Sequence, residues 1–201
     1  RSFRVKGFGR IGKVFYFGLS GKEKGAITLS HASDSTYCPA CSTKLNYKKI
    51  FFSHLGIWEC SNCGLKRPQL NISASPIFSL SGTYNKYNTL AAVLLARLNN
   101  INNRTIEQSL RQFKPAFGRQ EAMEIDGKKV QIFLSKNPTS FNESLRTIFE
   151  LKAKHILLVL NDRIPDGRDV SWIWDVDFEK IDSHRSVYIS GDRACDMAIR
   201  L

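Results

Sequence analysis

Residues 37–68 read YCPACSTKLNYKKIFFSHLGIWECSNCGLKRP and contain four of the five cysteines in the chain. The four form two pairs, Cys38-x-x-Cys41 and Cys60-x-x-Cys63, with 18 residues between the pairs. Each C-x-x-C turn directs two thiolates at one point. Two such turns supply the four sulfur ligands that a tetrahedral Zn²⁺ site prefers. This stretch therefore predicts a zinc ribbon.

Two disulfides are the alternative for these four cysteines. The fifth cysteine, Cys195, leaves an odd count, and the sequence shows no signal peptide. Disulfides are rare in the cytosol, so we expect zinc and a cytoplasmic location. A site with four protein ligands has no open coordination position, which makes a structural zinc the expectation. We expect Cys195 to be a small buried apolar residue on a helix.

Short strands are expected at residues 46–53 and 56–59, between the two cysteine pairs. The ribbon also carries the basic and aromatic side chains that nucleic-acid-binding ribbons use. They are Lys44, Lys48, Lys49, Lys66, Arg67, Tyr47, Phe51, Phe52 and Trp58. One function class is therefore a ribbon module that binds nucleic acid or protein without catalysis.

The charge balance points to an anionic partner. The 201 residues include 30 basic and 18 acidic side chains, giving a net charge of +12. Nucleic acid, a nucleotide, phospholipid or a pyrophosphate-bearing substrate would suit this charge. No apolar run approaches the roughly 20 residues of a membrane span, so no transmembrane segment is expected. The chain begins without Met and ends inside an expected helix, so we expect it to be a piece of a longer protein.

A glycine-rich motif, GFGRIG, occupies residues 7–12. This spacing binds a dinucleotide only where it follows a strand and opens a helix. Residues 13–18 (KVFYFG) are β-branched and aromatic and are expected to form a strand instead. A glycine-rich loop before a strand is therefore favoured over a dinucleotide site.

Helix and strand patterns alternate after the ribbon. Thr105-x-x-Gln108 and Ser140-x-x-Glu143 have the form of capping boxes, and Asp126-Gly127 is a strong hairpin turn. The expected helices cover residues 89–98, 102–113, 140–153 and a segment opened by Gly191. The expected strands cover residues 120–125, 128–134, 155–160, 170–174 and 186–190.

The second half is expected to contain a parallel α/β sheet. Residues 155–160 (HILLVL) are almost wholly apolar, which is typical of a strand in a sheet covered on both faces. The polar loop at residues 161–169 follows its carboxyl end. Ligands and catalytic groups gather at this edge of open α/β sheets.

Several motifs resemble elements of the Mur ligase family. Three of them are Gly82-x-x-Asn85-x-x-Asn88, Gly118-Arg119-x-Glu121 and Ser135-Lys136-Asn137-Pro138. An inserted Cys₄ ribbon is not general to Mur ligases, but it resembles the MurT subunits of lipid II isoglutaminyl synthase. The stretch at residues 161–175, with its Asp-Gly-Arg-Asp sequence, is similar to a signature of those subunits.

This resemblance implies an α/β, Mur-ligase-like fold in three parts. Residues 1–36 and 69–116 would belong to the central ATPase domain. Residues 37–68 would be the inserted zinc ribbon. Residues 117–201 would begin a Rossmann-like C-terminal Mur ligase domain, which would be incomplete.

The function implied by the resemblance is that of a ligase subunit in a glutamine-dependent amidotransferase. Such a complex uses ATP to activate the α-carboxylate of D-glutamate in the lipid II stem peptide as an acyl phosphate. A GatD-type glutaminase partner releases ammonia, which attacks the acyl phosphate to give D-isoglutamine. The partners implied are therefore the glutaminase, lipid II and ATP, with contact to the membrane face through the substrate.

Site residues carry over by motif. The carboxamides of Asn85 and Asn88 would face the adenine, and Arg119 would lie near the nucleotide. Lys136, Asn137 and Thr139 would lie near a phosphate or the glutamate carboxylate. Asp169 would reach across the interface to complete a Cys-His-Asp triad in the glutaminase. A carboxylate in that position fixes the histidine tautomer and stabilises the imidazolium.

Two departures from the family pattern matter. No GxxxxGK[ST] sequence for ATP and Mg²⁺ is present, and the acidic Mg²⁺ ligands expected before the ribbon are absent. We expect both to lie upstream of Arg1, so this chain alone should not turn over ATP.

Overall fold

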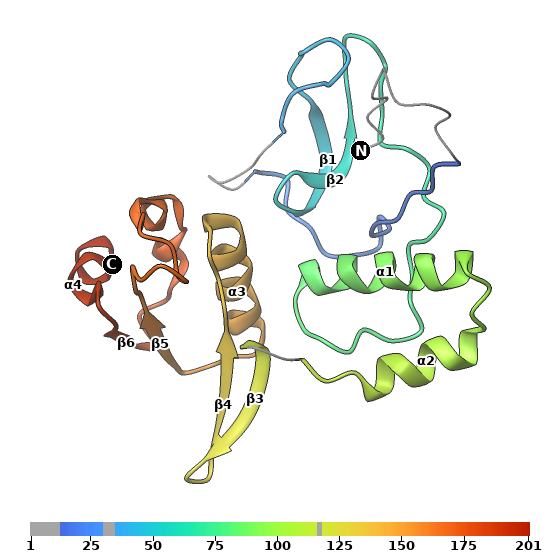
Figure 1. Cartoon of the computed structure of the whole chain (residues 1–201). Coiled ribbons are helices and arrows are strands. Elements are labelled where there is room, and N and C mark those ends of the chain that lie inside the picture. Colours follow the sequence, from blue (N-terminus) through green and yellow to red (C-terminus); the bar gives the residue numbers. More distant parts are fainter. Residues whose placement is uncertain (1–12, 30–34, 116–117) are drawn as a thin grey trace.

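The computed structural model describes residues 13–29, 35–115 and 118–201, so the glycine-rich motif at residues 7–12 lies outside the described residues. Figure 1 shows a hairpin above a pair of helices, and beside them a mixed helix and strand region that runs to the C-terminus. The elements are β1 (Asn46–Phe52), β2 (Leu55–Glu59), α1 (Thr83–Leu98), α2 (Asn103–Gln112), β3 (Arg119–Ile125), β4 (Lys128–Phe133), α3 (Pro138–Glu150), β5 (His155–Val159), η1 (Ser171–Asp175), η2 (Phe178–Lys180), β6 (Ser186–Ser190) and α4 (Ala194–Arg200).

The described residues form three two-stranded sheets, β1–β2, β3–β4 and β5–β6. The first two are antiparallel hairpins and the third is parallel. The hairpins predicted in the ribbon and around Asp126-Gly127 are therefore confirmed, as is the parallel pairing in the second half. Asp126 (φ 48°) and Gly127 (φ 71°) both have the positive φ that a tight hairpin turn requires.

The ribbon hairpin packs on α1 through one side chain above all. Phe51 of β1 is 1% exposed and shares a hydrophobic cluster with Leu19, Leu90 and Val93. Phe51 stands near the turn of the hairpin, whereas the cysteines stand at its opposite end. The turn end of the ribbon is therefore part of the core that α1 and α2 build.

Three expectations about the first half need correction. Residues 13–18 form no continuous strand, because their pairing is limited to one bridge between Phe17 and Ile72. Helix α1 begins at Thr83, six residues before the expected start, so both motif asparagines lie inside it. The capping box expected at Thr105 is wrong. Asn102 caps α2 by accepting a hydrogen bond from the Thr105 amide, 2.9 Å away, because Thr105 already lies in the first turn.

Helix α3 also begins earlier than the sequence pattern predicted. Its N-cap is Asn137, whose side chain accepts a hydrogen bond from the Ser140 amide at 2.8 Å. The Ser140 side chain completes the capping box by bonding back to the Asn137 backbone. Pro138 suits the first helical position because its missing N–H has no helical partner there. The capping box expected at Ser140 and Glu143 is therefore wrong.

The parallel pair β5–β6 buries one face only. Ile156 and Leu158 are 4% exposed and pack with Leu145 and Met197, whereas Leu157 is 62% exposed. The expectation of a strand covered on both faces is not met in the described residues. Buried and exposed side chains alternate along β5, although apolar and polar residues do not alternate in its sequence.

Two further expectations in this region are wrong. Residues 170–174 were expected to form a strand, but the chain forms the 3₁₀ helix η1 there, and Ile173 is the buried residue of this helix. The Asp169 side chain favours this turn because it accepts a hydrogen bond from the Ser171 amide. Cys195 is exposed on α4 rather than buried. None of the helices in the described ranges combines the length and the apolar character of a membrane span.

Candidate functional site

The four ribbon cysteines lie together at the end of the hairpin that is farther from α1. Their sulfur atoms all lie within 4.8 Å of one another. The Sγ atoms of Cys38 and Cys63 are 3.6 Å apart, and those of Cys41 and Cys60 are 3.5 Å apart. Tetrahedral zinc with Zn–S bonds of about 2.3 Å requires sulfur separations of about 3.8 Å. The spacing therefore suits a single metal ion.

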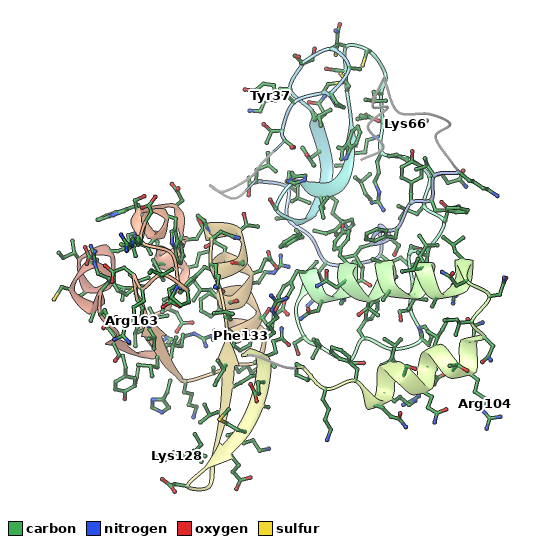
Figure 2. All side chains as sticks on the ribbon, in the orientation of Figure 1. Tyr37, Lys66, Arg104, Lys128, Phe133 and Arg163 are labelled. Carbon is green, nitrogen blue, oxygen red and sulfur yellow. The ribbon has the colours of Figure 1, made fainter. Side chains whose placement is uncertain are left out.

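The contacts around Cys41 favour its thiolate. The Ala40 amide points at the Cys38 sulfur at 3.4 Å. Hydrogen bonds with the Thr43 side chain and amide lower the pKa of Cys41 to about 5. Tyr37 and Lys66, labelled on the ribbon in Figure 2, form backbone bridges with Lys44 and Glu59 that close the two turns. All four cysteines are free, so a metal can bind all four.

The second feature is a cleft of about 1170 Å³ between α1, the base of the β3–β4 hairpin and the N-terminus of α3. Phe133, labelled in Figure 2 where that hairpin meets α3, lies on its wall. Ligand pockets for small molecules commonly measure about 300–1,000 Å³, so the cleft has room for a nucleotide. All six residues that the sequence assigned to a nucleotide line it: Asn85, Asn88, Arg119, Lys136, Asn137 and Thr139.

The two motif asparagines have different environments on α1. Asn85 is 7% exposed, and its Nδ2 donates to the Ser81 backbone oxygen at 2.7 Å. Asn88 is exposed at the cleft wall. Asn85 therefore holds the start of α1, and Asn88 is the carboxamide more accessible to a ligand.

Glycine is required at the start of this motif. Gly82 has φ 88°, and a Cβ atom there would lie 2.6 Å from Oγ1 of the buried Thr147 on α3. The absence of a side chain lets the start of α1 approach α3. This close approach forms one corner of the cleft.

The N-terminus of α3 supplies the second wall. Asn137, Thr139 and Ser140 line the cleft there, and the positive end of the helix dipole favours an anion. The Asn137 side chain is already used as the helix cap. Lys136 lies just before the cap, and its Nζ donates to the Pro165 backbone oxygen at 2.9 Å.

Asp169 lies apart from this cleft. It is exposed on the loop that follows β5, and its Oδ1 accepts a hydrogen bond from the Ser171 amide at 2.8 Å. Hydrogen bonds from the Ser171 side chain and amide lower the pKa of Asp169 below its usual value. The carboxylate is thus ionised at neutral pH and faces solvent.

Crossed ion pairs fix the beginning of this loop to the start of the segment after β6. Arg163 contacts Asp192 at 2.6 Å, and Arg193 contacts Asp162 at 3.0 Å. Figure 2 labels Arg163 in this part of the chain. Each of the two segments thus supplies one acidic and one basic partner at the carboxyl ends of the parallel strands.

Comparison with known proteins identifies the C-terminal part. Residues 134–201 match the family model described as MurT ligase C-terminal. This part of the chain is therefore similar to a MurT ligase C-terminal domain, and it carries that name below. Helix α3, the β5–β6 sheet and the Asp169 loop all lie in this MurT ligase C-terminal domain.

Similarity extends beyond the MurT ligase C-terminal domain. The chain is 31% identical over 207 residues to the MurT subunit of glutamine-hydrolysing lipid II isoglutaminyl synthase from Staphylococcus aureus strain COL, covering 94% of this chain and 47% of the relative. It is 34% identical over 188 residues to the MurT subunit from Streptococcus pneumoniae strain R6, covering 84% of this chain and 42% of the relative. The chain therefore spans about half the length of the curated relatives it matches.

A solved structure shares the fold. A pseudomurein peptide ligase type C from Methanothermus fervidus superimposes with a TM-score of 0.63 and 23% sequence identity, covering 90% of this chain and 42% of that chain. The expected α/β, Mur-ligase-type fold is thereby shown. Both the MurT ligase C-terminal domain and the region before it contribute to that match, since it covers nine tenths of the chain.

Sequence reasoning missed Gln120 at the base of the hairpin. Its side chain is 3% exposed, donates to the Ser81 oxygen at 2.7 Å and to the Tyr84 hydroxyl at 2.8 Å, and accepts from the Ser81 amide at 3.1 Å. Its φ of 63° is unusual outside glycine, and the register of the hairpin shifts at this residue. Gln120 joins the β3–β4 hairpin to the start of α1.

Glu143 was also missed as a cleft residue, because the sequence placed it in a capping box. It lies in the MurT ligase C-terminal domain, lines the cleft and forms an ion pair with Arg146 at 2.5 Å. Burial raises the pKa of Glu143 to about 7, although the positive charge of Arg146 acts in the opposite direction. No sequence signal distinguished this carboxylate from an ordinary helix residue.

Proposed function

We propose that this chain belongs to the ligase subunit of a glutamine-dependent amidotransferase that amidates lipid II. In this reaction ATP activates the α-carboxylate of D-glutamate as an acyl phosphate, and ammonia displaces phosphate to form D-isoglutamine. The relatives carry the name of that enzyme and cover most of the chain. The observation that carries the proposal is the convergence of all six expected nucleotide residues on one cleft.

The cleft suits the adenosine end and the phosphates of ATP in different places. Asn88 offers both a donor and an acceptor to the edge of adenine. Arg119 presents a guanidinium, which suits ribose or phosphate oxygens. Lys136 and the N-terminus of α3 offer positive charge to a phosphate or to the carboxylate being activated. Asn85 acts indirectly by holding the start of α1.

Asp169 serves a GatD-type glutaminase in this proposal. Its ionised carboxylate would accept the Nδ1 proton of the partner's catalytic histidine, fixing the tautomer in which the other nitrogen takes a proton from cysteine. Exposure supports this role, because a carboxylate that completes a site on another chain must be accessible. The lowered pKa keeps it charged.

The metals have separate roles. Cys38, Cys41, Cys60 and Cys63 would hold one structural zinc, whose closed coordination leaves no position for substrate. Mg²⁺ would accompany ATP and neutralise its phosphates. The residues that bind ATP phosphates and Mg²⁺ in a P-loop are expected outside this chain. Reaction is proposed in the cytoplasm, where ATP and glutamine are available, at the membrane face that presents the lipid substrate.

The alternative of a nucleic-acid-binding ribbon is not favoured. Phe51 is buried in the core rather than available to stack on a base. Lys49 donates from Nζ to the backbone oxygens of Gly21 and Glu23, and Arg67 donates to the Leu19 oxygen at 2.7 Å. Several of the side chains that suggested the alternative thus hold the ribbon to the rest of the chain.

The test uses the full-length subunit purified with its co-expressed glutaminase. We expect glutamine-dependent and ATP-dependent conversion of lipid II to the amidated form, detected by mass spectrometry. Arg119→Ala should raise the Kd for ATP about tenfold, the equivalent of about 1.4 kcal/mol of lost binding. Arg111→Ala, which changes an exposed arginine on α2, is the matched control. Absence of ATP binding by the full-length subunit would refute the proposal.

A further inference from the structure

Lys136 contacts two features that the proposed function treats separately. Its side chain lines the cleft, and its Nζ donates to the Pro165 backbone oxygen at 2.9 Å. Pro165 lies four residues before Asp169 in the loop after β5. A single ammonium group therefore connects the cleft wall to the loop that carries the proposed triad carboxylate.

The rest of this loop is held at both ends. The crossed ion pairs of Asp162 and Arg163 fix its first residues to the segment after β6. The amides of Asp166 and Gly167 both donate to the Arg163 backbone oxygen, which closes a tight turn around Pro165. A shift of Pro165 is therefore transmitted to the residues that follow.

The far end of the Asp169 segment also meets the cleft region. Helix η1 begins immediately after Val170 and ends at Asp175, which lines the cleft. Trp172 of η1 packs against Phe141 of α3 with ring centroids 5.9 Å apart. Asp169 thus lies between two points, Pro165 and Asp175, that are each tied to the cleft wall.

We propose that Lys136 is a positioning residue that couples occupancy of the cleft to the placement of Asp169. The ammonium group has three protons, and one of them binds the Pro165 oxygen. The other two can bind oxygen atoms of a phosphate in the cleft. A bound phosphate fixes the ammonium, and the fixed ammonium holds Pro165 in the position that presents Asp169 to the partner. This inference rests on the proposed function, because it requires ATP in the cleft and a glutaminase that uses Asp169.

The binding part of this coupling, between the nucleotide and the partner, is reciprocal by thermodynamic necessity. A nucleotide that favours the presented position of Asp169 should stimulate glutamine hydrolysis by the partner. The bound partner should in turn tighten nucleotide binding by the same subunit. Ammonia would then be released mainly when nucleotide is bound in the cleft. Glutamine would therefore not be hydrolysed when the ligase cannot use the ammonia for amidation.

The experiment measures glutamine hydrolysis by the full-length complex with and without saturating AMP-PNP, and the Kd for AMP-PNP with and without the partner. In the wild type we expect AMP-PNP to raise the rate of glutamine hydrolysis about fivefold or more (the hydrolysis ratio). We expect the partner to lower the Kd for AMP-PNP by about fivefold or more (the Kd ratio), within the usual range of allosteric coupling. Lys136→Met should reduce both ratios to about one, and Lys136→Arg should retain part of them. Lys128→Met, at the hairpin tip labelled in Figure 2, is the control of equal charge change and should leave both ratios unchanged.

A second variant separates coupling from nucleotide binding, because removing Lys136 takes away a contact in the cleft as well as the contact with Pro165. Pro165→Gly frees the backbone at a residue outside the cleft lining. It should leave the Kd for AMP-PNP of the isolated subunit within about twofold while lowering the hydrolysis ratio. Ratios unchanged by both Lys136→Met and Pro165→Gly would overturn the inference. If the wild type binds AMP-PNP but both the hydrolysis ratio and the Kd ratio equal one, the coupling inference is overturned and the proposed function is left intact. If the wild type fails to bind AMP-PNP, the proposed function itself is removed.

Discussion

Arg146 of α3 donates a hydrogen bond from Nη1 to the Phe51 backbone oxygen in β1, 3.1 Å away. The two residues are 95 positions apart in the sequence. One lies in the MurT ligase C-terminal domain and the other in the ribbon, and the same arginine pairs with Glu143 on the cleft wall. Arg146 therefore links the ribbon strand β1 to a carboxylate on the cleft wall through one side chain of α3.

The buried Glu143 makes stability depend on pH. Its pKa is raised from 4.5 to about 7 in the folded chain. The folded state therefore holds this proton more tightly than the unfolded state does, and stabilisation present below about pH 4.5 is lost as the pH rises through 7. Glu143→Gln should remove this pH-dependent loss of stability. The loss is on the order of 3 kcal/mol once the pH exceeds the folded pKa of about 7.

Urea unfolding of the wild type and Glu143→Gln at pH 5 and pH 8 measures the effect. The variant should gain stability relative to the wild type on going from pH 5 to pH 8. Glu124→Gln, an exposed glutamate on β3, is the control. An identical pH dependence in wild type and Glu143→Gln would show that Glu143 ionises normally.

Asp169→Asn should reduce glutamine hydrolysis by the co-purified glutaminase by roughly 10³-fold or more. Asparagine keeps an oxygen that can accept the Ser171 amide, so the turn that begins η1 is retained and the charge alone is lost. Asp166→Asn on the same exposed loop is the matched control. The assay measures glutamate release, and full activity in Asp169→Asn would remove this residue from the triad.

Metal analysis of protein purified without chelator should find close to one zinc per chain. Cys60→Ser should abolish this zinc, because three remaining sulfurs do not complete the tetrahedral set. Cys195→Ser changes a cysteine outside the cluster and should leave the zinc content unchanged. Protein free of zinc yet fully folded would contradict the ribbon site.

Gln120→Ala should destabilise the chain by about 1–3 kcal/mol, because it removes the three hydrogen bonds that the buried Gln120 side chain makes with Ser81 and Tyr84. Gln108→Ala, which changes an exposed glutamine on α2, is the control and should cost little. Denaturant unfolding measures both variants. Equal, small effects would show that the hairpin and α1 are not joined through Gln120.

The sequence predicted features that depend on local chemistry. The cysteine spacing predicted the four clustered sulfurs, and Asp126-Gly127 predicted the observed hairpin turn. The six nucleotide residues came from motif resemblance, and the fold brings them to one cleft.

Features that depend on tertiary contacts were not predictable in the same way. The run HILLVL did not reveal that one face of β5 is exposed. Gln120 bonds to Ser81, 39 residues away, and Glu143 lines the cleft, although its position three residues after Ser140 also matched a capping box. The short helix η1 replaced an expected strand because Asp169 bonds locally to the chain that follows it.

The ribbon hairpin has two ends with different surroundings. The cysteines gather at one end, and the turn at the other end supplies Phe52, Ser53 and His54 to the cleft wall. In the proposed zinc site, loss of the metal at the outer end would loosen two strands whose inner end shapes the cleft wall. The two strands of the hairpin would connect the metal site to the cleft wall. The shape of the cleft would then depend on the zinc available to the cell, although no cysteine lines the cleft.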